Sequence, residues 1–155
     1  MLLLESLAVA LFVCPWRVGL RPPMGGHPGR AGLWVVRLLA LKLMVLSGAV
    51  KLLSEDPTWA DLTALEYHYW SQPIPTWTAW FVHHLGPGFH KISTILMFAG
   101  ELALPWTMFG PRPVRLLGAW GMVGLLVGMA ATGNYGYFHA LTLVLLVPLF
   151  DDRHL

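Results

Sequence analysis

Long runs of apolar residues alternate with short polar or Pro- and Gly-rich segments along the chain. A helix that crosses a bilayer needs about 20 mostly apolar residues, with about 17 as a workable minimum. Five stretches approach this length: residues 1–16, 31–53, 92–109, 116–132 and 137–150. The pattern therefore predicts an all-α fold, a multi-pass helical bundle with four or five membrane helices in a single membrane domain over residues 1–155.

Residues 54–91 are too polar and too rich in proline to span a membrane, which predicts an exposed loop. Asp56 followed by Pro57 is typical of an N-cap and the first position of a helix, and predicts a short helix through about Trp70. Pro73 and Pro75 end that helix. The loop is thus expected to carry short helices of its own.

A second short helix is predicted after Pro75, where Trp77, Trp80 and Phe81 recur at helical spacing. These three aromatic residues share one helix face. A helix of this kind lies in the headgroup plane with its rings in the membrane boundary. The alternative is that the rings pack beneath the loop as a small core.

Composition agrees with a membrane protein, because 56% of the residues are hydrophobic and only 12% are charged. Soluble domains carry about 25% charged residues, so a soluble enzyme is not expected. Disorder is not expected either, because the chain has ample apolar surface to bury. The net charge of +2 is dispersed, so nucleic acid is not a predicted partner, and the lipid bilayer is.

Three ionisable residues, Arg37, Lys42 and Glu101, lie well inside predicted membrane helices. Such residues are costly in a bilayer and face protein or water. Glu101 must be paired, and Arg37 or Lys42 are the natural partners. Lys51 lies near a helix end, where a lysine reaches the interface. On a helical wheel Thr94, Met97 and Pro105 share the face of Glu101.

The spacing Gly124-x-x-x-Gly128 is one that lets membrane helices approach closely. It favours helix association, either inside this chain or with a second copy.

The four histidines of residues 54–91 come without the spacing of a zinc motif, so no metal site is predicted. Asp61 and His68 stand seven residues apart on the predicted helix, where a solvated face is favoured over a hydrogen bond. Nucleotide-binding and nucleophile motifs are also missing from the sequence, so neither a cofactor nor a catalytic residue is predicted.

Basic residues gather in residues 17–30 and 110–115, whereas residues 54–90 carry four acidic residues and no Lys or Arg. The positive-inside rule places the aromatic loop outside the cytoplasm, together with the turn at Asn134.

Taken as a set, motifs along the whole chain resemble the lipase maturation factor family. The motifs are Lys42-Leu43-Met44, Lys51-Leu52, Asp56 to Leu65, Tyr67-His68-Tyr69, Gln72-Pro73-Ile74-Pro75, Phe89-His90, Glu101-Leu102 with Pro105, Phe109-Gly110-Pro111-Arg112, Thr132-Gly133-Asn134-Tyr135 and Leu149-Phe150-Asp151-Asp152.

The resemblance implies a multi-pass membrane protein that assists the folding or maturation of secreted proteins, with lipases as clients. It implies the endoplasmic reticulum membrane in a eukaryote, and the inner membrane would apply to a bacterial source. Members of the family usually have further membrane helices before this region and a soluble domain after it, so the chain corresponds to the central part of the membrane region.

Candidate functional or structural polar positions are Lys42, Asp61, Tyr67, His68, Tyr69, Gln72, Glu101 and Asn134. Three positions depart from the family pattern, which usually has an acid at Trp70, an arginine at Lys42 and an asparagine at His139. A site built on these positions would be altered in this chain.

Two alternatives stay open beside the maturation helper. One is an integral membrane enzyme with a carboxylase-like membrane fold, in which Lys42, His68 and Glu101 are acid and base candidates. The other is a small ion or proton conductor that uses Glu101.

Overall fold

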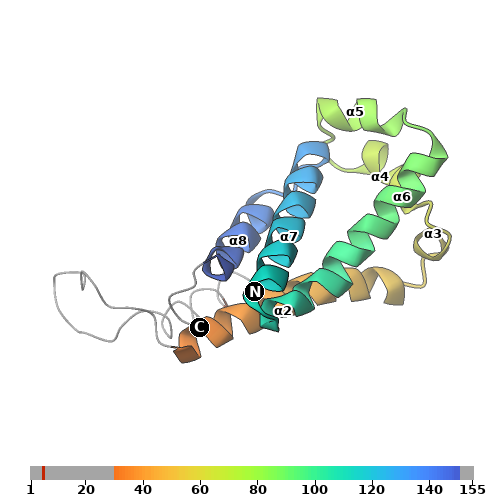
Figure 1. Ribbon diagram of the computed structural model, residues 1–155. Helices are drawn as coiled ribbons and strands as arrows, with labels where there is room; N and C mark the ends of the chain where they lie inside the picture. Colours follow the sequence, from red (N-terminus) through yellow and green to blue (C-terminus); the bar gives the residue numbers. More distant parts are fainter. Residues whose placement is uncertain (1–4, 6–29, 151–155) are drawn as a thin grey trace.

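The computed structural model describes Glu5 and residues 30–150, and in this part of the chain the fold is entirely helical (Figure 1). The predicted helix at 1–16 therefore lies outside the described residues, apart from Glu5. The longer elements are α2 (Arg30–Leu53), α6 (Pro87–Phe98) with its continuations η1 (Ala99–Ala103) and η2 (Leu104–Phe109), α7 (Arg112–Thr132), and α8 (Tyr137–Leu146) followed by η3 (Val147–Leu149). The short helices α3 (Pro57–Ala60), α4 (Ala64–Ser71) and α5 (Trp77–His83) lie between α2 and α6.

Three helices of the described part are long and apolar enough to cross a membrane: Ala31–Leu53, Pro87–Phe109 and Arg112–Thr132. Tyr137–Leu149 is a shorter apolar helix. These four elements follow the order of the four stretches predicted within residues 30–150, although the last is shorter than a full membrane span. The predicted all-α multi-pass bundle is confirmed.

Two membrane helices begin earlier than the hydrophobic pattern indicated. The third span starts at Pro87 instead of residue 92, and the fourth starts at Arg112 instead of residue 116. Both starts have a proline in the first two helical positions, where the missing N–H costs no hydrogen bond. The polar first turn hid these starts from a prediction based on apolar residues.

The single short helix predicted from Asp56 through Trp70 is wrong, because the chain forms α3 and α4 with a break between them. Asp56 does cap α3, since its side chain accepts a hydrogen bond from the Thr58 N–H at 3.0 Å. The break lies at Leu62, whose φ of 58° is in the left-handed region and ends helical geometry.

Pro105 changes the geometry of the third span. The N–H of Leu104 bonds to the carbonyl of Ala99, five residues back, so η1 is a short π-helix, and η2 then tightens to a 3₁₀-helix. Proline removes a ladder hydrogen bond, and π turns re-satisfy the backbone around such a defect. Glu101 therefore lies in an irregular segment of the span.

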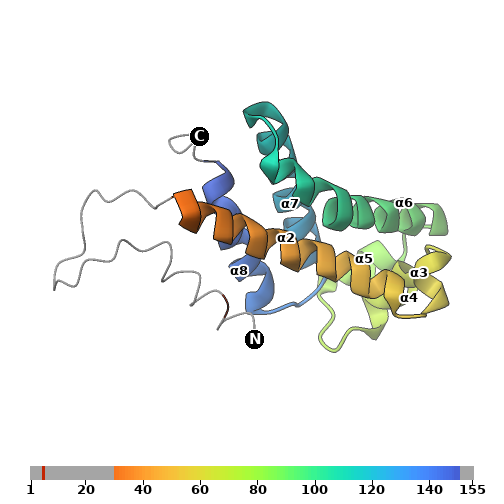
Figure 2. The same cartoon turned by 90° about the horizontal axis from the view of Figure 1, so that it is seen from below.

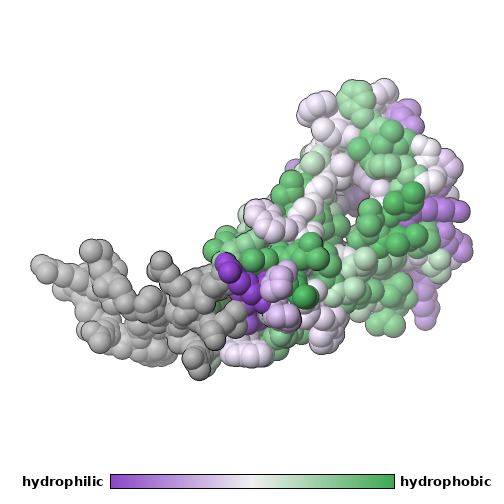
Figure 3. All heavy atoms as spheres, viewed as in Figure 1, coloured by the Kyte–Doolittle hydropathy of each residue, from purple (hydrophilic) through white to green (hydrophobic). Residues whose placement is uncertain are grey.

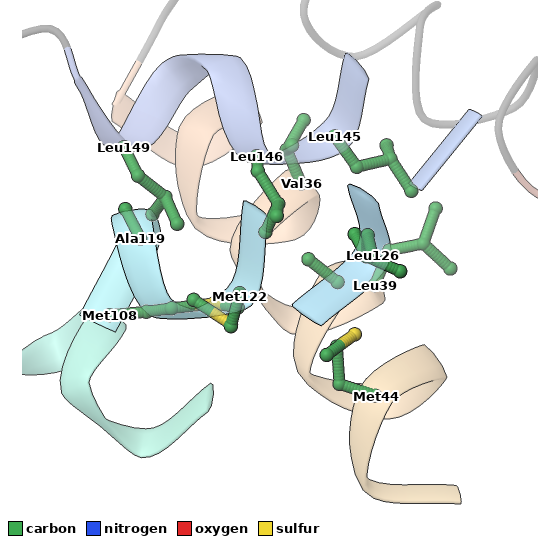
Figure 4. Close-up of a cluster of buried hydrophobic side chains, with 11 residues drawn as sticks. Val36, Leu39, Met44, Met108, Ala119, Met122, Leu126, Leu145, Leu146 and Leu149 are labelled. Atoms are coloured by element: carbon green, nitrogen blue, oxygen red, sulfur yellow. The ribbon is translucent and has the colours of Figure 1, made fainter. Parts of the chain in front are cut away.

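The main apolar core lies where α2, η2, α7 and α8 meet (Figure 4). Its fully buried members include Met108, Ala119, Met122 and Leu146. Seen from below, α2 passes across α8 and runs beside α6 (Figure 2). The core thus holds α2 against the η2–α7 pair.

Apolar residues also cover much of the outer surface over α6 and α7, and hydrophilic residues gather towards the ends (Figure 3). Ile92, Leu117 and Val127 are each more than half exposed. Exposed apolar side chains around a helical bundle are expected where lipid, and not water, is the solvent.

Close packing of α7 depends on Gly118 and Gly121, and not on the predicted pair Gly124 and Gly128. A Cβ at Gly118 would overlap the side chain of Thr107 in η2. A Cβ at Gly124 or Gly128 would meet nothing within 4 Å. Packing of Gly124 and Gly128 against another helix of the described chain is therefore excluded, and association with a second copy stays a prediction.

Candidate functional site

A cavity of about 880 Å³ lies between α2, α6 and α7. α6 and α7 diverge from η2 towards the end that carries α4 and α5, and α8 lies alongside α7 (Figure 1). The walls are mostly apolar, with Leu43, Met97, Leu125 and Phe138 among the lining residues. Several polar side chains from different elements also line the cavity, among them Ser47, Lys51, His68, Glu101, Tyr135 and His139.

Glu101 forms a buried ion pair with Lys51, which corrects the predicted pairing with Arg37 or Lys42. The Lys51 Nζ lies 2.6 Å from both carboxylate oxygens of Glu101, and the Ser47 hydroxyl donates to the carboxylate at 3.0 Å. Glu101 is only 2% exposed. Glu101 lies in the π turn of η1, opposite the C-terminal half of α2.

Lys42 and Arg37 have other surroundings. The Lys42 Nζ contacts the Glu5 carboxylate at 2.8 Å, and both side chains are exposed at the surface. Arg37 is buried, as is Met44 one heptad further along the same face of α2. The stripe on which Arg37, Met44 and Lys51 lie therefore faces protein, and Lys42 points away from it, as the helical wheel indicated.

The prediction that Thr94, Met97 and Pro105 share the face of Glu101 is confirmed. Thr94, Met97, Glu101 and Pro105 are all buried. His90, at the start of this face, is 3% exposed. Its ring lies 5.6 Å from the Tyr69 ring, which connects α4 to α6.

His68 and Tyr135 join α4 to the turn before α8. The His68 Nε2 and the Tyr135 hydroxyl are 2.6 Å apart, and their rings are stacked. Burial and, to a lesser degree, the nearby charge of Lys51 lower the pKa of His68 from its ordinary value. Burial, followed by the neighbours Tyr69 and Glu101, raises the pKa of Tyr135 to about 12. The pair is therefore uncharged at neutral pH.

The loop before α5 and the first turn of α5 cap the C-terminal end of α7. The Gln72 side-chain amide donates to the Thr132 carbonyl at 2.9 Å, and the Thr78 hydroxyl donates to the Ala131 carbonyl. The last carbonyls of a helix lack intrahelical partners, so these bonds satisfy groups that would otherwise be left open. The Gln72-Pro73-Ile74-Pro75 and Thr132-Gly133-Asn134-Tyr135 motifs therefore meet at one end of the bundle.

The remaining predicted polar positions lie at the surface or in the small core under the loop. Asp61 and Tyr67 are exposed, and Tyr69 is buried against Leu65 and Ala79. The Asn134 side chain is exposed and accepts a long hydrogen bond from the Gly136 N–H at 3.4 Å. Asp61 caps the end of α3 and does not bond to His68.

The three predicted interfacial aromatic residues are exposed on α5. Trp77, Trp80 and Phe81 are 77%, 60% and 56% exposed, so the alternative of a core beneath the loop is excluded for them. The core side of α5 is instead formed by Ala79, which is fully buried.

The structure does not bring together Lys42, His68 and Glu101, the acid and base candidates of the membrane-enzyme alternative. Glu101 and His68 line the same cavity, but Lys42 lies outside it and contacts Glu5. Three further cavity residues were missed as site candidates: Lys51, Tyr135 and His139. The described residues also form no group of three or more His, Cys, Asp or Glu side chains that could hold a metal ion.

Acidification below about pH 6.5 should destabilise the fold through His68. The folded state holds the pKa of His68 below that of the unfolded chain, so the unfolded chain binds more protons and stability rises with pH through this window. We expect the free energy of unfolding in detergent micelles to increase from pH 5 to pH 7, and His68→Gln to flatten that increase. Gln72→Ala, which removes no titratable group, should keep the slope of the parent, and an unchanged slope in His68→Gln would contradict the account.

These features define a class: a multi-pass helical membrane protein with a buried ion pair and a cavity inside the bundle. A family model described as the lipase maturation factor transmembrane domain matches residues 1–155. The chain is 44% identical to lipase maturation factor 2 of Rattus norvegicus and 43% identical to that of Homo sapiens, and 99% of it is covered in both cases. Lipase maturation factor 1 of Homo sapiens is 30% identical, also over 99% of the chain. The protein belongs to the lipase maturation factor family.

The chain spans 23% of the length of the two lipase maturation factor 2 proteins and 27% of lipase maturation factor 1. No solved structure matches.

Proposed function

We propose that this chain is part of a membrane-embedded factor that assists the maturation of secreted proteins, with lipases as clients, without making or breaking covalent bonds. Its membrane would be that of the endoplasmic reticulum in a eukaryotic cell and the inner membrane in a bacterium. Membership of the family over the full chain carries the proposal. The name of these relatives, lipase maturation factor 2, supplies lipases as the client class.

The exposed face of α5 supports this role physically. Trp77, Trp80 and Phe81 together present a large aromatic surface at the end of the bundle. Such a patch is unusual on a protein surface unless it meets membrane or another protein. A partly folded client exposes apolar surface of matching character, and aromatic residues are enriched where proteins bind one another.

α5 is also held firmly, so its aromatic face is presented in a fixed position. The Thr76 side chain caps α5 by accepting from the Ala79 N–H, and Thr78 bonds to the end of α7. A rigid surface loses less conformational entropy when it binds than a mobile one does.

A secretion assay tests the proposal. The protein is expressed with a secreted lipase in cells depleted of their own maturation factors, and secreted lipase activity is divided by total lipase antigen. The parent should raise this ratio above the empty vector. The variant Trp77→Ser, Trp80→Ser, Phe81→Ser should lower the ratio at least about tenfold, because the loss of even one aromatic hot spot of about 2 kcal/mol weakens binding by about thirtyfold.

Ile74→Ser is the matched control, because Ile74 is 66% exposed in the same loop but lies before α5. It should retain the activity of the parent. A parent that leaves the ratio at the level of the empty vector, or a triple variant as active as the parent, would contradict the proposal.

A further inference from the structure

The cavity carries no net charge. Lys51 and Glu101 are its two charged lining residues within the described part of the chain, and they neutralise each other in the ion pair. Its other polar residues are hydroxyl and imidazole groups. Its volume of about 880 Å³ lies in the range of about 300 to 1,000 Å³ that is usual for small-molecule sites. An apolar cavity with a neutral polar region suits an uncharged amphiphile.

His139 supplies a hydrogen-bonding group without a partner. Its side chain lines the cavity, is only 5% exposed, and has neither ring nitrogen bonded within the described residues. A buried polar group left unpaired costs about 1 to 3 kcal/mol, so it favours a ligand that pairs with it. A neutral imidazole has one donor and one acceptor, and a hydroxyl group can serve both.

The cavity opens to the outer, apolar surface of the bundle. Gly124 and Gly128 line it and are themselves exposed, and Leu96 on the opposite wall is 63% exposed. A side chain built at Gly124 or Gly128 would enter open space. A hydrocarbon chain can therefore pass between α6 and α7 from the apolar surroundings without displacing backbone.

We propose that the cavity binds one uncharged lipid with a hydroxyl-bearing head, such as a monoacylglycerol, with its head at His139 and its hydrocarbon chain along Gly124 and Gly128. The apolar walls bury the hydrocarbon chain of the lipid. The polar region has no net charge, so it excludes a charged headgroup, which would find no counter-charge to pair with. The proposal does not depend on the action of the chain on lipase clients.

Photo-labelling in native membranes tests the proposal. The probe is a monoacylglycerol whose acyl chain carries a photoreactive group and a clickable tag. The same acyl chain as a free fatty acid gives an anionic comparison, and as a phosphatidylcholine it gives a zwitterionic one. Labelled residues are located by mass spectrometry. We expect the monoacylglycerol to label α7 around Gly124 and Gly128 more strongly than the other two probes do.

Two substitutions separate the cavity from the outer surface. Gly124→Leu fills the open space and should reduce monoacylglycerol labelling about tenfold, which corresponds to about 1.4 kcal/mol of binding free energy. Ala130→Leu, at an exposed position of the same helix that does not line the cavity, should leave labelling unchanged. His139→Phe keeps an aromatic ring but removes the polar atoms, and should abolish the preference for the monoacylglycerol over the other two probes.

Equal labelling by all three probes in the parent would overturn the proposal, because it indicates lipid bound only as solvent. So would labelling that Gly124→Leu and Ala130→Leu reduce equally, or labelling spread evenly over exposed positions such as Leu117 and Val144. Each variant is first checked for the melting temperature of the parent, and Gly128→Leu takes the place of Gly124→Leu if the latter is unfolded.

Discussion

Glu101→Ala is expected to lower the free energy of unfolding by about 3 to 5 kcal/mol. The substitution removes one partner of a buried ion pair and leaves the Lys51 ammonium, only 18% exposed, with no opposite charge. An uncompensated charge at this depth costs far more than the pair contributes. The measurement is equilibrium unfolding in mixed detergent micelles, followed by circular dichroism and tryptophan fluorescence.

The exposed ion pair that Lys42, on the same helix as Lys51, forms with Glu5 is the matched control. Lys42 and Glu5 are 51% and 36% exposed, so Lys42→Ala should cost only about 0 to 1 kcal/mol. The double variant Lys51→Met, Glu101→Met should recover most of the loss, because no buried charge remains. Equal effects of Glu101→Ala and Lys42→Ala would show that the buried pair does not hold α2 against the third span.

Gly118→Val is expected to destabilise the bundle by about 2 to 3 kcal/mol. A Cβ at this position would overlap Thr107 in η2, and the branched side chain adds two further methyl groups to a closed contact. Because Thr107 lies in η2 and Gly118 in α7, relief of the overlap requires these two elements to move apart. The same unfolding measurement checks this result.

Gly124→Val provides the comparison within α7. Its added side chain enters the cavity and meets no atom within 4 Å at the Cβ. Valine and glycine differ little in helix propensity, so the change should stay within about 0.5 kcal/mol of the parent. Similar losses for both variants would contradict the assignment of Gly118 as the packing glycine.

The membrane helices could be predicted because their signal is local. A span needs a long, mostly apolar run, and such runs are visible at residues 31–53 and 137–150 without knowledge of any neighbour. The first residues of two helices were harder to predict, because the helices that begin at Pro87 and Arg112 start with polar or proline-rich turns whose composition is typical of loops. The break at Leu62 could not be predicted, because a leucine gives no sign of a positive φ.

The partner of Glu101 could not be predicted for a different reason. Helical periodicity places Arg37 and Lys51 on one face of α2, but it does not say how far α2 slides along the third span. The π turn of η1, in which Glu101 lies, is also not visible in the periodicity. Lys51 was interpreted as an interfacial residue because it lies near the end of its helix.

The cavity also depends on long-range arrangement. His68 meets Tyr135 across 67 residues of sequence, and the resemblance of motifs singled out Tyr135 and Asn134 together without showing which of them faces inwards. Once folded, Tyr135 lines the cavity and Asn134 points to the surface.

The central claim is that the aromatic face of α5 contacts lipase clients. Its most direct test is a photoreactive amino acid placed at Trp77 in native membranes while a secreted lipase is being synthesised, with adducts identified by mass spectrometry. The account predicts an adduct with the lipase that is lost in Trp80→Ser, Phe81→Ser and retained in Ile74→Ser. Absence of any lipase adduct, with the protein folded and abundant in the same membranes, would contradict it.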